Sequence, residues 1–157
     1  MIVAFCGHRR MDNKKETERW LVKTCGQLIA EGADTFYLGG YGEFDALAAQ
    51  IARKLRTNHG GLKVVLVIPY LNRNADTAGY NEIVYPPLEA VPLRFAISRR
   101  NEWMVEQADV VVSYVTHDWG GAYKTMEYAR KKHKRIINYS SICREKEDRY
   151  DNGDGSL

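Results

Sequence analysis

The sequence predicts a single α/β domain in which helices cover both faces of a doubly wound parallel sheet of five strands. Short apolar runs alternate along the chain with longer segments in which apolar residues recur at helical spacing. The most continuous apolar run, at 62–68, is rich in valine and apolar on both faces, as a buried parallel strand requires. A length of 157 residues suits one domain with a sizeable core.

The individual elements follow from the same patterns. Strands are predicted at 2–6, 35–38, 62–68, 110–115 and 135–139. Helices are predicted from residue 13 to the glycine at 32, around an apolar stripe from Phe44 to Leu55, at 98–107 and at 122–133. Residues 70–94 are rich in proline, asparagine and glycine and are expected to form an irregular excursion. Right-handed crossovers then give the strand order 3-2-1-4-5, which is a Rossmann-like sheet.

Composition sets the expected class and setting of the protein. Lys plus Arg (23) exceed Asp plus Glu (20) by only three, and this small excess does not by itself argue for nucleic acid, which is not expected as a partner. No apolar run is long enough to cross a membrane, and the N-terminal residues lack a signal-peptide pattern, so we expect a cytoplasmic protein. We expect a folded domain over 1–140 and a charged tail over 141–157.

Ligands of doubly wound sheets bind at the carboxyl ends of the strands, where the winding reverses, here between the first and fourth strands. Three loops leave the sheet at that edge: 7–10, 39–45 and 116–121. Two of them place a pair of glycines at a helix N-terminus, where the free N–H groups attract an anion. The sequence has neither the dinucleotide-binding GxGxxG after its first strand nor a P-loop. The loops therefore predict a phosphate-bearing ligand held in another way, although tight structural turns would give the same pattern.

Several side chains near these loops have both a functional and a structural interpretation. Arg9 and Arg100 can form forked hydrogen bonds to phosphate. His8 can act on a ribose or as an acid or base, or simply pack at the strand end. Asp45 and Glu127 can bind ribose hydroxyls, or only interact with their helix dipoles. Trp103 and Trp119 can stack on a base or close the core. No metal pattern is present, and neither a metal nor a cofactor is predicted.

Four segments, taken together and in this order, resemble the SLOG superfamily, and within it the YpsA-like (DUF1273) branch. They are Gly7-His8-Arg9; Gly39, Gly40 and Asp45; Arg100, Asn101, Met104 and Val105; and Tyr128, Ala129, Lys131 and Lys132. The superfamily includes the Lonely Guy phosphoribohydrolases and the DprA-like Rossmann domains. The resemblance implies a Rossmann-like domain that binds a nucleotide or an ADP-ribose-like molecule as a sensor, carrier or sequestering protein. It is also compatible with a homodimer.

Two alternatives follow from other members of the superfamily. Lonely Guy enzymes carry Pro-Gly-Gly-x-Gly-Thr-x-x-Glu after an arginine, which would make Arg100 and Glu127 the catalytic residues of a nucleoside monophosphate N-glycosidase. This sequence keeps Gly121 and Thr125 but has Gly120 for the proline, and Glu127 stands one position early. The third alternative, single-stranded DNA binding, rests on the DprA resemblance and the basic residues 130–135. The predicted ligand-binding residues are Gly7, His8, Arg9, Gly39, Gly40, Tyr41, Asp45, Arg100, Asn101, Gly120, Gly121, Thr125 and Glu127.

Overall fold

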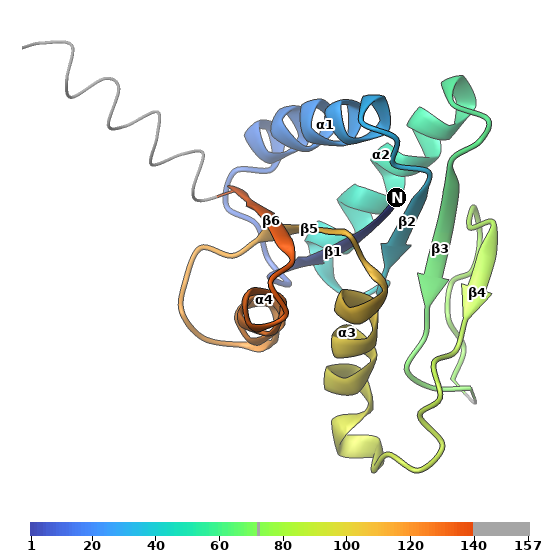
Figure 1. Ribbon diagram of the computed structural model, residues 1–157, viewed down its shortest axis with the longest axis vertical. Coiled ribbons are helices and arrows are strands. Elements are labelled where there is room, and N and C mark those ends of the chain that lie inside the picture. The colour runs from blue at the N-terminus through green and yellow to red at the C-terminus, as the bar shows by residue number, and fades with distance from the viewer. Residues whose placement is uncertain (72, 140–157) are drawn as a thin grey trace, which may run out of the picture.

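The computed structural model describes residues 1–71 and 73–139, which fold into a parallel sheet covered by helices (Figure 1). The strands are β1 (Ile2–Gly7), β2 (Thr35–Leu38), β3 (Lys63–Val67), β4 (Glu82–Val84), β5 (Val110–Tyr114) and β6 (Arg135–Asn138). Their order across the sheet is β4-β3-β2-β1-β5-β6, and every pair of neighbours is parallel. The Rossmann-like α/β architecture and the central position of the first strand are confirmed.

The helices pack in two pairs, one on each face of the sheet (Figure 1). Helices α1 (Lys14–Ala30) and α2 (Gly42–Asn58) cover one face, and α3 (Ala96–Gln107) and α4 (Gly121–Lys131) cover the other. A short 3-10 turn, η1 (Leu93–Phe95), leads into α3. Helices on both faces explain why the central strands are largely apolar on both faces, since both are mostly shielded from water.

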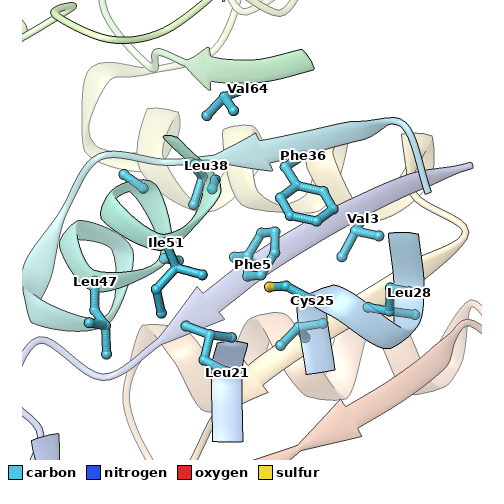
Figure 2. Packing of buried hydrophobic residues seen from close by; sticks show 14 of the residues in the cluster. Val3, Phe5, Leu21, Cys25, Leu28, Phe36, Leu38, Leu47, Ile51 and Val64 are labelled. Atoms are coloured by element: carbon cyan, nitrogen blue, oxygen red, sulfur yellow. The ribbon is translucent and has the colours of Figure 1, made fainter. Parts of the chain in front are cut away.

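Alternation along β1 distributes its side chains between the two faces. Val3 and Phe5 lie in the core beneath α1 and α2, whereas Ala4 lies in the core beneath α3 and α4. Figure 2 shows the first of these cores, in which Leu21 of α1 meets the strand side chains. The rings of Phe5 and Phe36 pack edge to face with centroids 5.1 Å apart. The core therefore fixes the register of β1 and β2, and with it the position of the loops that leave them.

The expected sheet of five strands in the order 3-2-1-4-5 is wrong, because the described residues form a sheet of six strands in the order β4-β3-β2-β1-β5-β6. The additional strand, β4, lies within the predicted irregular excursion and pairs with β3 at the edge of the sheet. It has only three residues, and two of them are exposed, so it lacks both the length and the apolar pattern that identify a strand. Backbone contacts hold it instead: Ile68 N–H donates to the Val84 carbonyl at 2.8 Å.

The division into a domain over 1–140 and a tail over 141–157 stays a prediction, since residues 140–157 lie outside the described part of the chain. Within the described residues, no helix is both long enough and apolar enough to span a bilayer.

Candidate ligand-binding site

A cavity of about 560 Å³ lies at the carboxyl edge of the sheet, next to the boundary between β1 and β5. The loops after β1, β2 and β5 and the start of α3 contribute to its lining. We call it the edge cavity. Of the predicted ligand-binding residues, those that line it are Gly7, His8, Arg9, Gly39, Tyr41, Asp45, Arg100, Asn101, Gly120, Gly121 and Thr125. The three loops singled out by the sequence thus meet at one hollow, as the topology of the sheet predicts.

Arg100 is the most deeply buried charged side chain of this region, with 2% of its surface exposed. Its Nη1 donates to the carbonyl oxygens of Gly39 at 2.8 Å and Val67 at 2.7 Å, and its Nε donates to Asn101 Oδ1 at 2.8 Å. Burial lowers the pKa of the guanidinium, and the charge of Asp45 opposes that effect. Arg100 therefore links the loop after β2 to the end of β3 through these hydrogen bonds. It also brings a positive charge to the cavity wall.

Asp45, in the first turn of α2, supplies a buried carboxylate with 7% of its surface exposed. Its Oδ2 accepts a hydrogen bond from Tyr41 N–H at 3.2 Å. Its Oδ1 has no hydrogen-bond partner among the described residues. Burial raises the pKa of this carboxyl to about 6, even though neighbouring backbone N–H groups and Arg100 act to lower it. Asp45 thus lines the edge cavity and holds a buried hydrogen-bond acceptor that is unused among the described residues.

Gly39 separates these two opposite charges. A side chain at this position would place its Cβ 3.0 Å from the Arg100 guanidinium carbon and 3.1 Å from Asp45 Oδ2. Real Cβ contacts are rarely so close, so any other residue at this position would require Arg100 and Asp45 to shift by a few tenths of an ångström.

The N-terminus of α4 forms another part of the cavity wall. Gly120 precedes the helix with a φ of +90°, a conformation that favours glycine. The first bond along the helix runs from Lys124 N–H to the Gly120 carbonyl at 3.1 Å. The N–H groups of residues 121–123 therefore have no intrahelical acceptor, and no hydrogen bond from them is found in the described part of the chain. This is the arrangement that attracts phosphate groups to helix N-termini.

Three aromatic rings form a stack that the sequence did not predict. The His8 and His117 rings are 3.6 Å apart and inclined by 12°, and His117 lies 3.8 Å from the indole of Trp119. Thr116 N–H donates to His8 Nε2 at 3.0 Å, so this nitrogen is unprotonated. Burial and the neighbouring His117 lower the pKa of His8. The indole ends the stack with 67% of its surface exposed, at the rim of the edge cavity.

A buried asparagine holds the start of the loop that carries this stack. Asn138 Oδ1 accepts hydrogen bonds from Ser113 Oγ at 2.9 Å and from Val115 N–H at 3.0 Å. Its Nδ2 donates to the Val115 carbonyl at 3.1 Å. The backbone pairing of β5 with β6 ends at Ser113, and hydrogen bonds of the Asn138 side chain continue it to Val115. These bonds set the direction in which the chain continues from β5 towards Thr116.

Three of the candidate residues lie elsewhere. Glu127 does not line the edge cavity, and its carboxylate is paired with Arg130 on the surface of α4. Gly40 lines a neighbouring cavity. Trp103 stacks on Tyr37, with ring centroids 5.7 Å apart, and packs against the core beneath α3 and α4. The structure therefore does not bring Arg100 and Glu127 together in the edge cavity, and the catalytic role of Glu127 stays a prediction. Among the described residues, no group of three or more His, Cys, Asp or Glu side chains could hold a metal ion.

Known proteins resemble this chain in fold. No family model and no curated protein matches its sequence. DNA processing protein A from Helicobacter pylori, described for its single-stranded DNA binding mode, aligns over 88% of this chain and 64% of its own, with 19% identity and a TM-score of 0.63. The same protein from Streptococcus pneumoniae aligns over 87% and 49%, with 20% identity and a TM-score of 0.64. A molybdenum cofactor binding protein from Rippkaea orientalis aligns over 96% and 84%, with 20% identity and a TM-score of 0.62.

These similarities show a shared fold, and this chain spans between about half and two thirds of the length of the two DNA processing proteins. Our expectation against nucleic acid as a partner is wrong, because two fold neighbours are DNA processing proteins and one is described for binding single-stranded DNA. That expectation rested on a net charge of +3, which does not report where the charges lie. Arg9 and Arg10 are both exposed at the edge cavity.

Proposed function

We propose that the protein binds a nucleotide-like ligand through its phosphate and ribose in the edge cavity. The observation that carries this proposal is that one cavity is lined both by the first turn of α4 and by Asp45, whose Oδ1 lacks a partner among the described residues. A helix N-terminus attracts an anion, and a carboxylate accepts hydrogen bonds from sugar hydroxyls. A phosphorylated riboside carries both groups.

The remaining cavity walls suit the other parts of such a ligand. Arg9 is exposed there and can add a charge-assisted hydrogen bond to phosphate. The outer face of Trp119, whose inner face lies against His117, can stack on a base. The volume of about 560 Å³ falls within the range of small-molecule sites, which is roughly 300–1,000 Å³.

Two substitutions at Gly121 test the phosphate site by calorimetry with adenosine 5′-monophosphate. Gly121→Pro removes one N–H from the first position of α4, where proline is tolerated because that N–H has no partner in the helix. Gly121→Ala is the matched control, because it keeps the N–H and its Cβ would meet nothing within 4 Å. We expect the proline variant to bind roughly ten-fold more weakly and the alanine variant to bind like the wild type. Equal affinity in all three proteins would refute the phosphate site.

Single-stranded DNA is the second candidate ligand, and the fold shared with DNA processing protein A favours it. Its phosphates would meet the same N–H groups and arginines as those of a free nucleotide. Fluorescence anisotropy with a labelled oligothymidine tests this candidate. Binding that weakens steeply with salt, and that adenosine 5′-monophosphate displaces, would support DNA in the edge cavity. Binding without displacement would place the DNA on another surface.

We further infer that the chain belongs to the YpsA-like branch of the SLOG superfamily. This inference is supported by Gly7-His8-Arg9 and by Gly39 and Asp45, which come from two separate motifs and line one cavity. The phosphoribohydrolase alternative depends on Glu127, whose carboxylate contacts Arg130 instead of lining that cavity. We therefore propose binding in preference to base release. Free adenine formed from adenosine 5′-monophosphate, and abolished by Glu127→Gln, would overturn this preference.

A further inference from the structure

We propose that a second cavity beside the edge cavity holds a second nucleoside, so that the ligand is a linear dinucleotide, two nucleosides joined through phosphate. This inference rests on the proposed function of the edge cavity, because one half of the ligand must bind there. The second cavity measures about 320 Å³ and lies between α2, the end of β3, and residues 70, 73–76 and 80. We call it the side cavity.

The two cavities share a wall. Gly39 and Tyr41, in the loop after β2, line both of them. The Tyr41 side chain is 43% exposed, and the Arg100 guanidinium carbon lies 5.4 Å from its ring centroid. A ligand leaving the edge cavity past Tyr41 would therefore enter the side cavity directly. The group that crosses this wall would pass beside the buried positive charge of Arg100, which suits a phosphate.

The far side of the side cavity is anchored to α2. Arg53 Nη2 donates to the Ala78 carbonyl at 2.7 Å. Arg56 Nη1 donates to the Gly79 carbonyl at 3.0 Å and to Asn81 Oδ1 at 2.7 Å. These bonds clamp residues 78–81 against the helix, and Asn81 Oδ1 also accepts from Val64 N–H at 2.8 Å, at the start of β3. The chain thus builds this wall from contacts between distant segments, and the cavity does not depend on a lone surface loop.

The lining of the side cavity has the chemistry of a site for a base and its phosphate. Arg73 lies over the ring of Tyr70, with 4.1 Å from the guanidinium carbon to the ring centroid, and Arg53 lies over Tyr80 at 5.0 Å. The ion pairs of the described residues include neither arginine. Aromatic rings that stack on bases, combined with cations that meet the backbone, are how proteins hold single-stranded nucleotides.

The size of the side cavity supports one nucleoside. A volume of about 320 Å³ is at the lower end of the range for small-molecule sites, so it leaves room for one ring system and its sugar. Ala46 and Ala49 of α2 and Leu66 of β3 give it apolar walls, as a base requires. A mononucleotide bound in the edge cavity would leave all of these groups unused.

Calorimetry with three ligands tests the proposal: adenosine 5′-monophosphate, the phosphodiester-linked dinucleotide pApA, and diadenosine diphosphate, in which a pyrophosphate joins the two nucleosides. We expect at least one dinucleotide to bind roughly ten-fold or more tightly than the mononucleotide, because a second base is stacked. The dinucleotide that gains affinity identifies the linkage. Arg73→Gln and, in a separate protein, Tyr70→Leu should abolish this gain. Arg94→Gln, which removes the same charge from an exposed residue outside both cavities, should preserve it.

The outcomes separate this inference from the proposed function. If the mononucleotide binds and neither dinucleotide binds more tightly, the side cavity is not a nucleoside site and only the present inference falls. The same conclusion follows if a dinucleotide gains affinity that neither Arg73→Gln nor Tyr70→Leu reduces. If no ligand of the three binds at millimolar concentration, the proposed function fails and takes the inference with it.

Discussion

Replacing Asp45 with asparagine is expected to stabilise the ligand-free protein at neutral pH while weakening its affinity for a nucleotide. The carboxylate is buried, and its Oδ1 has no hydrogen-bond partner among the described residues. Ionising such a group inside the protein is unfavourable compared with ionising it in water. Asparagine has nearly the same shape, carries no charge and keeps an oxygen to accept the hydrogen bond from Tyr41 N–H.

The magnitude follows from the pKa of this carboxyl, which burial raises from 3.8 to about 6. One pKa unit corresponds to about 1.4 kcal/mol, so the ionised side chain destabilises the folded wild type by up to about 3 kcal/mol. The folded state binds the proton of Asp45 more tightly than the unfolded state does, and this difference sets the sign of the change in stability with pH. Wild-type stability therefore falls as the pH rises from about 4 to about 6 and then levels off. The Asp45→Asn variant lacks this loss, so its advantage is small at pH 4 and greatest above pH 6.

Urea unfolding at pH 4.5 and at pH 8 measures the effect, and Glu43→Gln is the matched control. Glu43 lies in the same first turn of α2, but it is exposed and accepts a hydrogen bond from Met11 N–H at 2.7 Å. An exposed carboxylate at a helix N-terminus stabilises the helix, so the control should lose a little stability at pH 8 where Asp45→Asn gains. In calorimetry at pH 8, Asp45→Asn should bind adenosine 5′-monophosphate about ten-fold or more weakly, since it loses a hydrogen bond to a charged acceptor.

Two results would refute this reasoning. A difference in unfolding free energy between wild type and Asp45→Asn that is the same at both pH values would mean that the buried charge is not its source. A variant that is less stable than wild type at pH 8 would mean that the attraction between Asp45 and Arg100 outweighs the unfavourable burial of the carboxylate.

Four further predictions concern the edge cavity and the end of β5 that supports it. Arg100→Met should lower the unfolding free energy by about 2–4 kcal/mol in urea titrations, because it leaves two buried carbonyls without a donor. Asn138→Ala should lower it by about 2–3 kcal/mol in the same assay, through the loss of three buried hydrogen bonds. Trp119→Ala should weaken calorimetric binding of adenosine 5′-monophosphate by about 1–3 kcal/mol and leave ribose 5-phosphate unaffected, if the indole stacks on the base. Because the pKa of His8 is lowered from 6.5, stability should fall as the pH drops below about 6.5, and His8→Gln should reduce that fall in pH-dependent thermal melts.

The parts of the fold that could be predicted are those that strong local patterns specify. The apolar runs and the helical stripes located the five longer strands and the four helices, and handedness then placed the first strand at the centre. The same topology brought the loops at 7–10, 39–45 and 116–121 to one edge, so residues such as Gly39, Asp45 and Gly121 were found without any knowledge of their contacts.

The remaining features depend on contacts between distant segments, which no local pattern records. Strand β4 is three residues long and is held by β3, and one wall of the side cavity includes Tyr80, in the segment that Arg53 and Arg56 bond to α2. The position of Glu127 outside the edge cavity has a simpler reason. Glu127 follows Thr125 by two residues, which turns it about 200° around the helix, away from the cavity that Thr125 lines. Counting along a motif gives a position in sequence, and helical geometry decides which way the side chain faces.

Three ionisable side chains whose pKa values are shifted by burial line the edge cavity. The edge cavity is lined by an aspartate that burial disfavours, an arginine that is almost fully inaccessible and a histidine whose pKa is held below its usual value. Well-packed apolar side chains would often stabilise a fold as well as buried charges do, or better. Ligand binding therefore explains the concentration of such groups around the cavity better than stabilisation of the sheet does. If this is correct, stability and ligand affinity should change in opposite directions on substitution of Asp45, whereas Asn138→Ala should reduce stability through the sheet alone.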